Sequence, residues 1–140
     1  MEEESKYYLI NEAGEKLTSS RGVSGSVTIF YDNGDIYEGA LLDGIREGRG
    51  IYRYKETKHL YDGGWEDNLR SGLGRMEYFG KGDYHGYWEN GRRHGEGTFK
   101  YKNGDVYSGW WKYGEKEGYG TYNFKETGMQ MCGEWVNGEI

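Results

Sequence analysis

The stretch "YHGYWENGRRHGEGTFKYKNGDV", residues 84–106, contains the pattern that decides the fold. Its opening places Tyr84, Gly86 and Trp88 on one face of a strand, because successive side chains of a strand point to opposite faces. After a turn, a Gly-x-Gly pair and two aromatic residues alternate in the same way. Near its end the stretch contains Asn-Gly, which is typical of a tight turn between two strands. It therefore predicts one β-hairpin and a turn into the next strand.

The same pattern recurs along the chain at a nearly constant spacing. Aligned on Tyr-x-Gly-x-Trp, successive units begin 24, 23, 23 and 24 residues apart. Such a period indicates a repeat architecture. The division is a half repeat at residues 24–36, repeats at 37–60, 61–83, 84–106 and 107–130, and a partial repeat at 131–140.

These units resemble the MORN repeat, which shares the Tyr-x-Gly-x-Trp segment, the turn, the Gly-x-Gly pair and the two following aromatic residues. The resemblance covers residues 24–140, with departures at Leu41 for Trp, Asn68 for the turn glycine and Met131 for Tyr. Residues 1–23 do not match. They form an acidic N-terminal segment in which "YYLINEAGEKL" is a candidate hairpin that caps the sheet.

The repeat predicts an all-β fold, an elongated single-layer antiparallel β-meander of repeated hairpins. Such a sheet has little core of its own, so we expect it to curl around its aromatic face and leave an open groove. Within one hairpin we expect Trp88 opposite Gly97 and Phe99 opposite Gly86, so that each ring covers a residue without a side chain. The "KNGD" turn predicts a three-residue loop that ends on a glycine with positive φ.

Composition supports strands and limits the classes of partner. Aromatic residues make up 17% of the chain, which carries 26 glycines and no proline. That much ring surface argues against disorder, although the chain is polar. A net charge of −6 argues against nucleic-acid binding, which calls for a basic face. The single Cys132 fits a reducing compartment. The start "MEEESKYY" is unlike a signal peptide, and no stretch reaches the length of a membrane span, so we expect a cytoplasmic protein.

No motif in the chain supports catalysis or metal binding. The Gly-x-Gly pairs are not followed by the helix that a nucleotide-binding loop requires. Nothing in the sequence assembles a nucleophile, a base and an orienting group, and no zinc or calcium spacing occurs. We therefore predict no enzyme, no cofactor and no metal. The basic turn Arg92-Arg93-His94 has no equivalent that would build a continuous basic stripe, and solvent exposure is the favoured interpretation.

The second face of the sheet is predicted to be polar, with two exceptions. Tyr87 and Trp110 occupy the same outward position in adjacent units. An aromatic pair on a polar face indicates a contact site. Burial under a loop or under the N-terminal segment is an equally good explanation.

We expect a non-enzymatic scaffold or adaptor that binds a helix or an extended peptide of another protein in the aromatic groove. The resemblance to MORN proteins implies a place in the cytoskeleton or in the axoneme of a cilium or flagellum. The stretch that runs from "GTYNFKETG" to "GEWVNG" is similar to MORN proteins of radial spokes. The predicted lining residues are Tyr61, Trp65, Tyr84, Trp88, Phe99, Tyr101, Tyr107, Trp111, Tyr122 and Phe124.

Two alternatives stay open, and a further contact is expected. The repeats of the family also serve as phosphoinositide-binding modules at membrane surfaces, a less favoured interpretation for an acidic chain, and as regulatory regions of larger enzymes. An open sheet edge at residues 131–140 would invite pairing with a second copy, so we also expect a homodimer.

Overall fold

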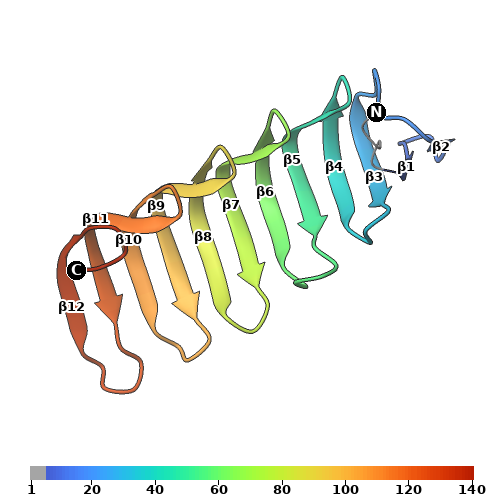
Figure 1. Ribbon diagram of the computed structural model, residues 1–140. Coiled ribbons are helices and arrows are strands. Elements are labelled where there is room, and N and C mark those ends of the chain that lie inside the picture. Colours follow the sequence, from blue (N-terminus) through green and yellow to red (C-terminus); the bar gives the residue numbers. More distant parts are fainter. Residues whose placement is uncertain (1–5) are drawn as a thin grey trace.

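A computed structural model describes residues 6–140, which form a single twelve-stranded sheet (Figure 1). Residues 1–5 lie outside this description, and with them most of the stretch "MEEESKYY" and the start of the acidic segment. The strands are β1 (Tyr7–Ile10), β2 (Lys16–Leu17), β3 (Gly25–Tyr31), β4 (Ile36–Leu42), β5 (Ile45–Arg53), β6 (Leu60–Glu66), β7 (Leu69–Tyr78), β8 (Gly82–Glu89), β9 (Arg92–Tyr101), β10 (Val106–Lys112), β11 (Glu115–Asn123) and β12 (Gln130–Trp135).

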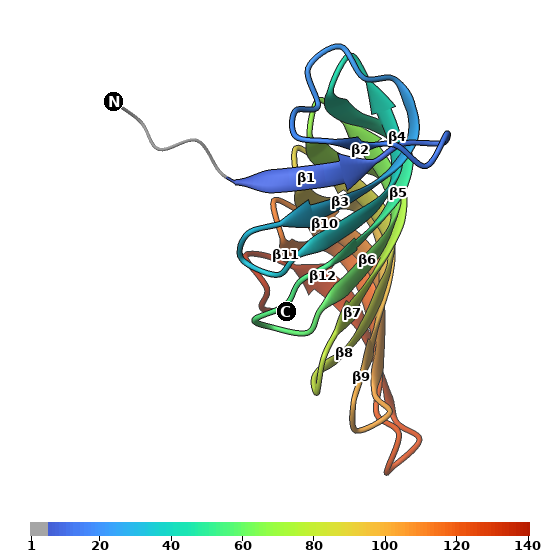
Figure 2. The ribbon, with the colours of Figure 1, turned by 90° about the vertical axis from the view of Figure 1, so that its right-hand side faces the viewer.

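From β3 to β12, each strand pairs antiparallel with the next strand in the chain. The part of the chain that the structure describes contains no helix, and the sheet does not close into a barrel. Seen near end-on, the sheet is twisted and curved across its width (Figure 2). The all-β, single-layer meander predicted from the repeat is thereby confirmed.

The predicted pairing within each hairpin is wrong by two residues. In the hairpin of β8 and β9, Gly86 lies opposite Gly97 and Tyr84 lies opposite Phe99. Trp88 faces a glycine as expected, but this glycine is Gly72 of the preceding unit. The repeat therefore places glycine against glycine inside a hairpin and tryptophan against glycine between hairpins.

A bulge that recurs in all four hairpins explains the shift. Three residues of β9, His94 to Glu96, lie opposite the single residue Tyr87 of β8. The central residue of this bulge, Gly95, has φ +94°, which favours glycine. Equivalent bulges contain Gly48, Gly72 and Gly118, all with positive φ. The first glycine of each Gly-x-Gly pair thus makes the bulge, and the second lies under a ring.

The loops at the two ends of the hairpins differ. At the bulged end, two-residue turns such as Asn90-Gly91 have both residues at positive φ. This conformation matches the twist of paired strands. At the other end, the predicted three-residue loop is confirmed: Lys102 to Gly104 separate Tyr101 from Asp105, and Gly104 has φ +95°. Two longer loops follow Tyr54 and Phe124, where the "KET" sequences add a residue.

The core of the sheet is a row of rings on one face, which we call the aromatic face. Tyrosine and tryptophan alternate along it edge to face from Trp65 to Trp135, with ring centroids 5.3 Å apart at each step. This geometry is favourable for aromatic pairs. At the N-terminal end, Leu9, Val27, Ile29 and Leu41 continue the core with aliphatic side chains.

Each buried tyrosine, and each buried tryptophan except Trp135, also satisfies its polar atom, whereas the Trp135 indole has no hydrogen-bond partner among the described residues. The Tyr84 hydroxyl donates to the carbonyl oxygen of Tyr87 at 2.8 Å, and the Trp88 indole donates to the carbonyl oxygen of Gly74 at 3.0 Å. Buried hydroxyl and indole groups need such partners. The same tyrosine bond occurs in the other three units, and the same indole bond occurs at Trp65 and Trp111.

The N-terminal segment pairs with the repeats. β1 and β2 form a short hairpin, and β1 continues the sheet beyond β3. Leu9 is fully buried there, and the Tyr7 hydroxyl donates to the Ser20 hydroxyl at 3.1 Å. The segment therefore covers the edge that β3 would otherwise expose.

Candidate interaction surfaces

The rings that we expected to contact a partner are mostly buried in the sheet itself. Tyr61, Tyr84 and Tyr107 have no exposed surface. Trp65, Trp88, Trp111 and Phe99 are also buried, and only Tyr101, Tyr122 and Phe124 of the predicted lining are partly exposed. A single-layer sheet has no second layer to cover its core, so other side chains of the same face must cover the rings. Seven of the ten predicted lining rings are therefore buried in the sheet, and the contact of the ten with a partner stays a prediction.

Four cationic side chains provide this cover, and we call them the cation row: Arg46, Arg70, Arg93 and Lys116. Each occupies the same place in its repeat and lies over the tryptophan of the next hairpin. The guanidinium carbon lies 4.9, 4.8 and 4.6 Å from the ring centroids of Trp65, Trp88 and Trp111. The ammonium of the fourth lies 5.1 Å from that of Trp135. These are distances at which cations attract aromatic faces.

Backbone carbonyl groups of the neighbouring turns hold the arginines in place. Arg70 donates to the carbonyl oxygen of Gly91, and Arg93 donates to that of Gly114, both at 2.7 Å. Arg46 donates to the carbonyl oxygen of Asn68 at 3.0 Å and to the Tyr31 hydroxyl at 2.8 Å. Each arginine thus fastens one hairpin to the turn of the next.

No member of the cation row forms an ion pair within the described part of the chain. The ion pairs there join other residues, such as Arg75 with Glu77 at 2.9 Å. Two carboxylates contact rings of the aromatic face, where Asp35 accepts a hydrogen bond from the Tyr52 hydroxyl and Asp105 accepts one from the Tyr122 hydroxyl. The four cations therefore have no direct carboxylate partner.

The interpretation that the basic turns build no continuous stripe is wrong. It treated each turn as one exposed unit. Alternation along β9 separates its members: Arg92 is exposed, whereas Arg93 points to the aromatic face. The signal was present in the sequence, because a basic residue stands two positions after the turn glycine or asparagine in every complete unit.

Two hollows lie between the cations, and together with the cation row they define the groove of this protein. One, of about 180 Å³, is lined by side chains that include Arg46, Tyr54 and Arg70. The other, of about 300 Å³, is lined by residues that include Arg93, Tyr101, Trp111 and Lys116. Their walls combine ring surface with positive charge, and the second also includes the acidic Glu115.

The tyrosines of the aromatic face are held neutral. Burial raises the pKa of Tyr37 and of Tyr107 to about 12, and it raises the pKa of Tyr61 and Tyr84 further, although the nearby guanidinium groups act in the opposite direction. At neutral pH the hydroxyl groups are therefore hydrogen-bond donors, and the positive charge of the groove comes from the cation row, with the carboxylate of Glu115 at the edge of the second hollow.

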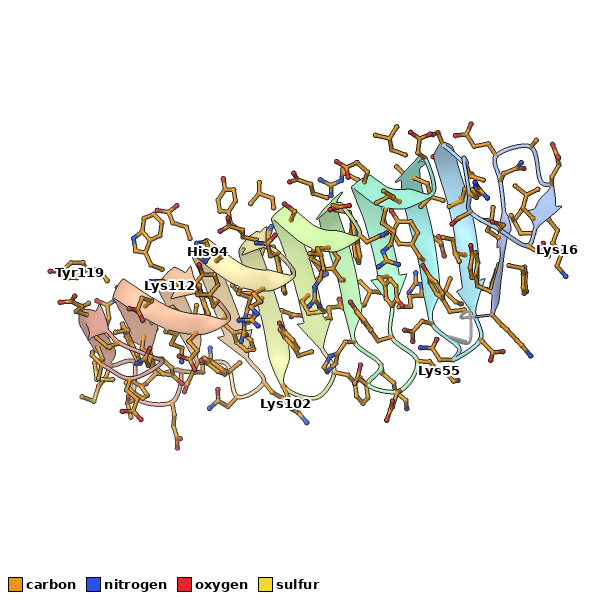
Figure 3. The ribbon with its side chains drawn as sticks, turned by 45° about the horizontal axis from the view of Figure 1, so that its top comes forward. Lys16, Lys55, His94, Lys102, Lys112 and Tyr119 are labelled. Atoms are coloured by element: carbon orange, nitrogen blue, oxygen red, sulfur yellow. The ribbon has the colours of Figure 1, made fainter. Side chains whose placement is uncertain are left out.

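The second face carries an exposed apolar row, which we call the outer row. Tyr87 and Trp110 are 46% and 50% exposed, so no loop or terminal segment in residues 6–140 covers them. Leu73 lies directly opposite Tyr87, and Tyr119, 73% exposed, lies in the bulge opposite Trp110. Figure 3 shows Tyr119 and His94 along one long side of the sheet, opposite the loops that carry Lys55 and Lys102. Sequence reasoning found two of these residues and missed the other two.

Residues 6–140 hold no group of three His, Cys, Asp or Glu side chains placed to bind a metal ion. A membrane-spanning helix is likewise not found among them.

Four segments of the chain match the MORN repeat family: residues 37–56, 61–81, 84–106 and 107–126, together more than half of its length. The chain belongs to the MORN repeat family. This confirms the resemblance inferred from the sequence. The matched segments are the four hairpins that carry the cation row. MORN repeats are typically non-enzymatic modules that bind proteins or membranes.

One MORN protein shares a stretch with this chain. MORN repeat-containing protein 3 of Xenopus laevis is 40% identical over 47 residues, which is 34% of this chain and 20% of the relative. The match thus spans about a fifth of that relative's length, and it bears on the repeat unit rather than on the whole protein.

Proposed function

We propose that this protein is a non-enzymatic scaffold or adaptor that binds a segment of another protein in the groove of its aromatic face. The observation that carries the proposal is the cation row, four positive charges that form no ion pair with the described residues and lie at equal repeat positions over a floor of rings.

The groove suits an elongated segment better than a small molecule. Its features recur from one hairpin to the next, and neighbouring hairpins are related by two strand spacings, about 10 Å. The hollows are shallow and separate, whereas a small-molecule site is usually a single deep pocket. A helix or an extended peptide that follows the long axis of the sheet would meet cation and hollow in turn.

Photo-crosslinking tests which face the partner uses. A benzophenone amino acid is placed at Tyr54 or Tyr101, which line the two hollows, and in a separate protein at Tyr119 of the outer row. Under this proposal a protein partner crosslinks at the groove positions and not at Tyr119. Crosslinks confined to Tyr119 would assign binding to the opposite face and overturn the proposal.

The setting that we propose is the cytoskeleton, in particular the axoneme and its radial spokes in a cilium or flagellum. It is supported by the stretch that runs from "GTYNFKETG" to "GEWVNG", which is similar to radial-spoke MORN proteins. The test is imaging of the tagged protein in ciliated cells, where a diffuse cytosolic distribution would contradict it.

A membrane-surface module that binds phosphoinositides is the second candidate, favoured by the same cation row. Phosphate headgroups are also anionic, and guanidinium groups bind them well. Sedimentation with phosphoinositide vesicles at physiological salt tests it. A regulatory repeat region within a larger enzyme is a third arrangement, decided by the sequence that adjoins these 140 residues in the gene.

A further inference from the structure

We propose that the segment bound in the groove is an acidic amphipathic helix whose carboxylates, seven residues apart, meet successive members of the cation row. This inference rests on the proposed function, namely that the groove holds a protein segment, and it adds the chemistry by which that segment is recognised.

Charge is the first argument. Arg93 has five N–H donors and uses one of them, for the carbonyl oxygen of Gly114. The ammonium group of Lys116 makes neither a hydrogen bond nor an ion pair with the residues that the structure describes, and it contacts only the rings around it. Both cations are partly exposed. Carboxylates are the groups that these free donors would bind most strongly.

The net charge of the chain strengthens this argument. It is −6, and the ion pairs join residues outside the cation row. An acidic segment would be repelled by the chain as a whole and attracted at the cation row. Such complementarity selects both the partner and its position.

Spacing selects a helix. Consecutive cations lie two strands apart, about 10 Å. Seven residues of α-helix rise about 10.5 Å and return to nearly the same face, so acidic residues at every seventh position would match the row. In an extended strand the same distance is covered by about three residues, which puts alternate carboxylates on opposite faces.

The hollows complete the pattern. Between two cations, each hollow presents ring surface, with Tyr54 and Trp65 in one and Phe99 and Trp111 in the other. A helix with a leucine three or four residues after each acidic residue would place an apolar side chain there. The predicted segment is therefore amphipathic, with acidic and apolar residues in alternation along one face.

The test uses a synthetic helical peptide with Glu at every seventh position and Leu three and four residues after each Glu, measured by fluorescence anisotropy. Arg93→Gln is compared with Arg92→Gln, because these adjacent residues of β9 point to opposite faces and each change removes one positive charge. Lys116→Gln and Lys112→Gln form a second pair, since the ammonium group of Lys116 makes no hydrogen bond whose loss would unfold the protein. Arg93→Lys restores the charge.

We expect Arg93→Gln and Lys116→Gln each to weaken binding about three- to tenfold, the range for one partly exposed charge-assisted contact. Arg92→Gln and Lys112→Gln should leave affinity unchanged, and Arg93→Lys should recover most of it. A peptide with Gln in place of Glu should bind at least about tenfold more weakly, and affinity for the Glu peptide should fall as NaCl is raised. Thermal unfolding of each variant shows whether it is folded.

Equal binding of the Glu and Gln peptides, or equal losses from Arg92→Gln and Arg93→Gln, would overturn this inference. If photo-crosslinking still placed a protein segment in the groove, the proposed function would stand and only the acidic chemistry would fail. Binding of phosphatidylserine or phosphoinositide vesicles that depends on Arg93, with no binding of the Glu peptide, would overturn both and assign the cation row to a membrane.

Discussion

The hydroxyl oxygen of Tyr84 lies over the α-carbon of Gly97, in the space where a β-carbon at that position would be. The same relationship joins Tyr37 to Gly50, Tyr61 to Gly74 and Tyr107 to Gly120. A tyrosine ring, a glycine beneath it and a hydrogen bond from the hydroxyl to the strand backbone together form the unit on which the sheet is built.

Replacing Gly97 by alanine should therefore destabilise the fold by about 1–3 kcal/mol, the cost of inserting a methyl group into a tightly packed site. Chemical denaturation measures the loss. Gly133→Ala is the control, because its β-carbon would meet only the flexible end of Ile140, and neither glycine has a positive φ. A loss of equal size in both variants would contradict the packing argument.

Truncation of the adjacent residues Trp110 and Trp111 to alanine should change the free energy of unfolding by very different amounts. Trp111 is buried beneath Arg93, and its change to alanine should cost about 3–5 kcal/mol of unfolding free energy. Trp110 is half exposed, and its change to alanine should alter stability by less than about 0.5 kcal/mol. Thermal unfolding compares the two. If Trp110→Ala destabilised as much as Trp111→Ala, the assignment of the two faces would be wrong.

Stability should decline at alkaline pH. The pKa of Tyr37 and of Tyr107 is about 12 in the folded chain and near 10 when unfolded. A group whose pKa is raised by folding stabilises the fold while it is protonated, so its contribution is complete below about pH 10 and disappears between about pH 10 and 12. The melting temperature should fall across that window, and tyrosinate absorbance should rise with it. A melting temperature that stayed level up to pH 12 would contradict this expectation.

Asp105 should organise the loop that follows Phe124. Its carboxylate accepts hydrogen bonds from the Tyr122 hydroxyl at 2.7 Å and from the backbone N–H of Lys125 at 2.9 Å. The hydrogen bond from the Lys125 backbone and then that from Tyr122 lower the pKa of Asp105. The stabilisation is therefore present at neutral pH and is lost as the pH falls through this lowered pKa.

Asp105→Asn should accordingly speed hydrogen exchange at the amide of Lys125 while leaving the rest of the sheet protected. Asp32→Asn is the control, because the Asp32 side chain is exposed and makes no hydrogen bond with the described residues. Unchanged protection of Lys125 in Asp105→Asn would show that the loop is held in another way.

The edge strand β12 should allow self-association. No strand covers its outer side among residues 6–140, and the exposed side chains Met131 and Cys132 lie along it. Light scattering should detect a dimer at high concentration, and Met131→Lys should abolish it, since a lysine on an edge strand opposes pairing. Light scattering that detected only a monomer at every concentration would contradict the predicted homodimer.

The sequence predicted the fold well because the same pattern occurs four times, and because Gly104 in "KNGD" indicates a three-residue loop. It failed on register because the bulge at Gly95 sets three residues against one, and glycine spacing alone does not distinguish a bulge from a continuous strand. The exposed pair Tyr87 and Trp110 was found because it departs from the repeat. The cation row was missed for the opposite reason: Arg93 conforms to the repeat, and its role depends on a contact with a ring in the next hairpin.

The alignment of the strands is also independent of loop length. The longer loops after Tyr54 and Phe124 add a residue at one end of a unit, yet Gly50 still lies opposite Gly63, and Gly120 opposite Gly133, without a register shift. A change of loop length is thus contained in the loop itself, because the glycines keep their pairing across it. Such a chain can gain, lose or vary units during evolution without losing the alignment of those that remain.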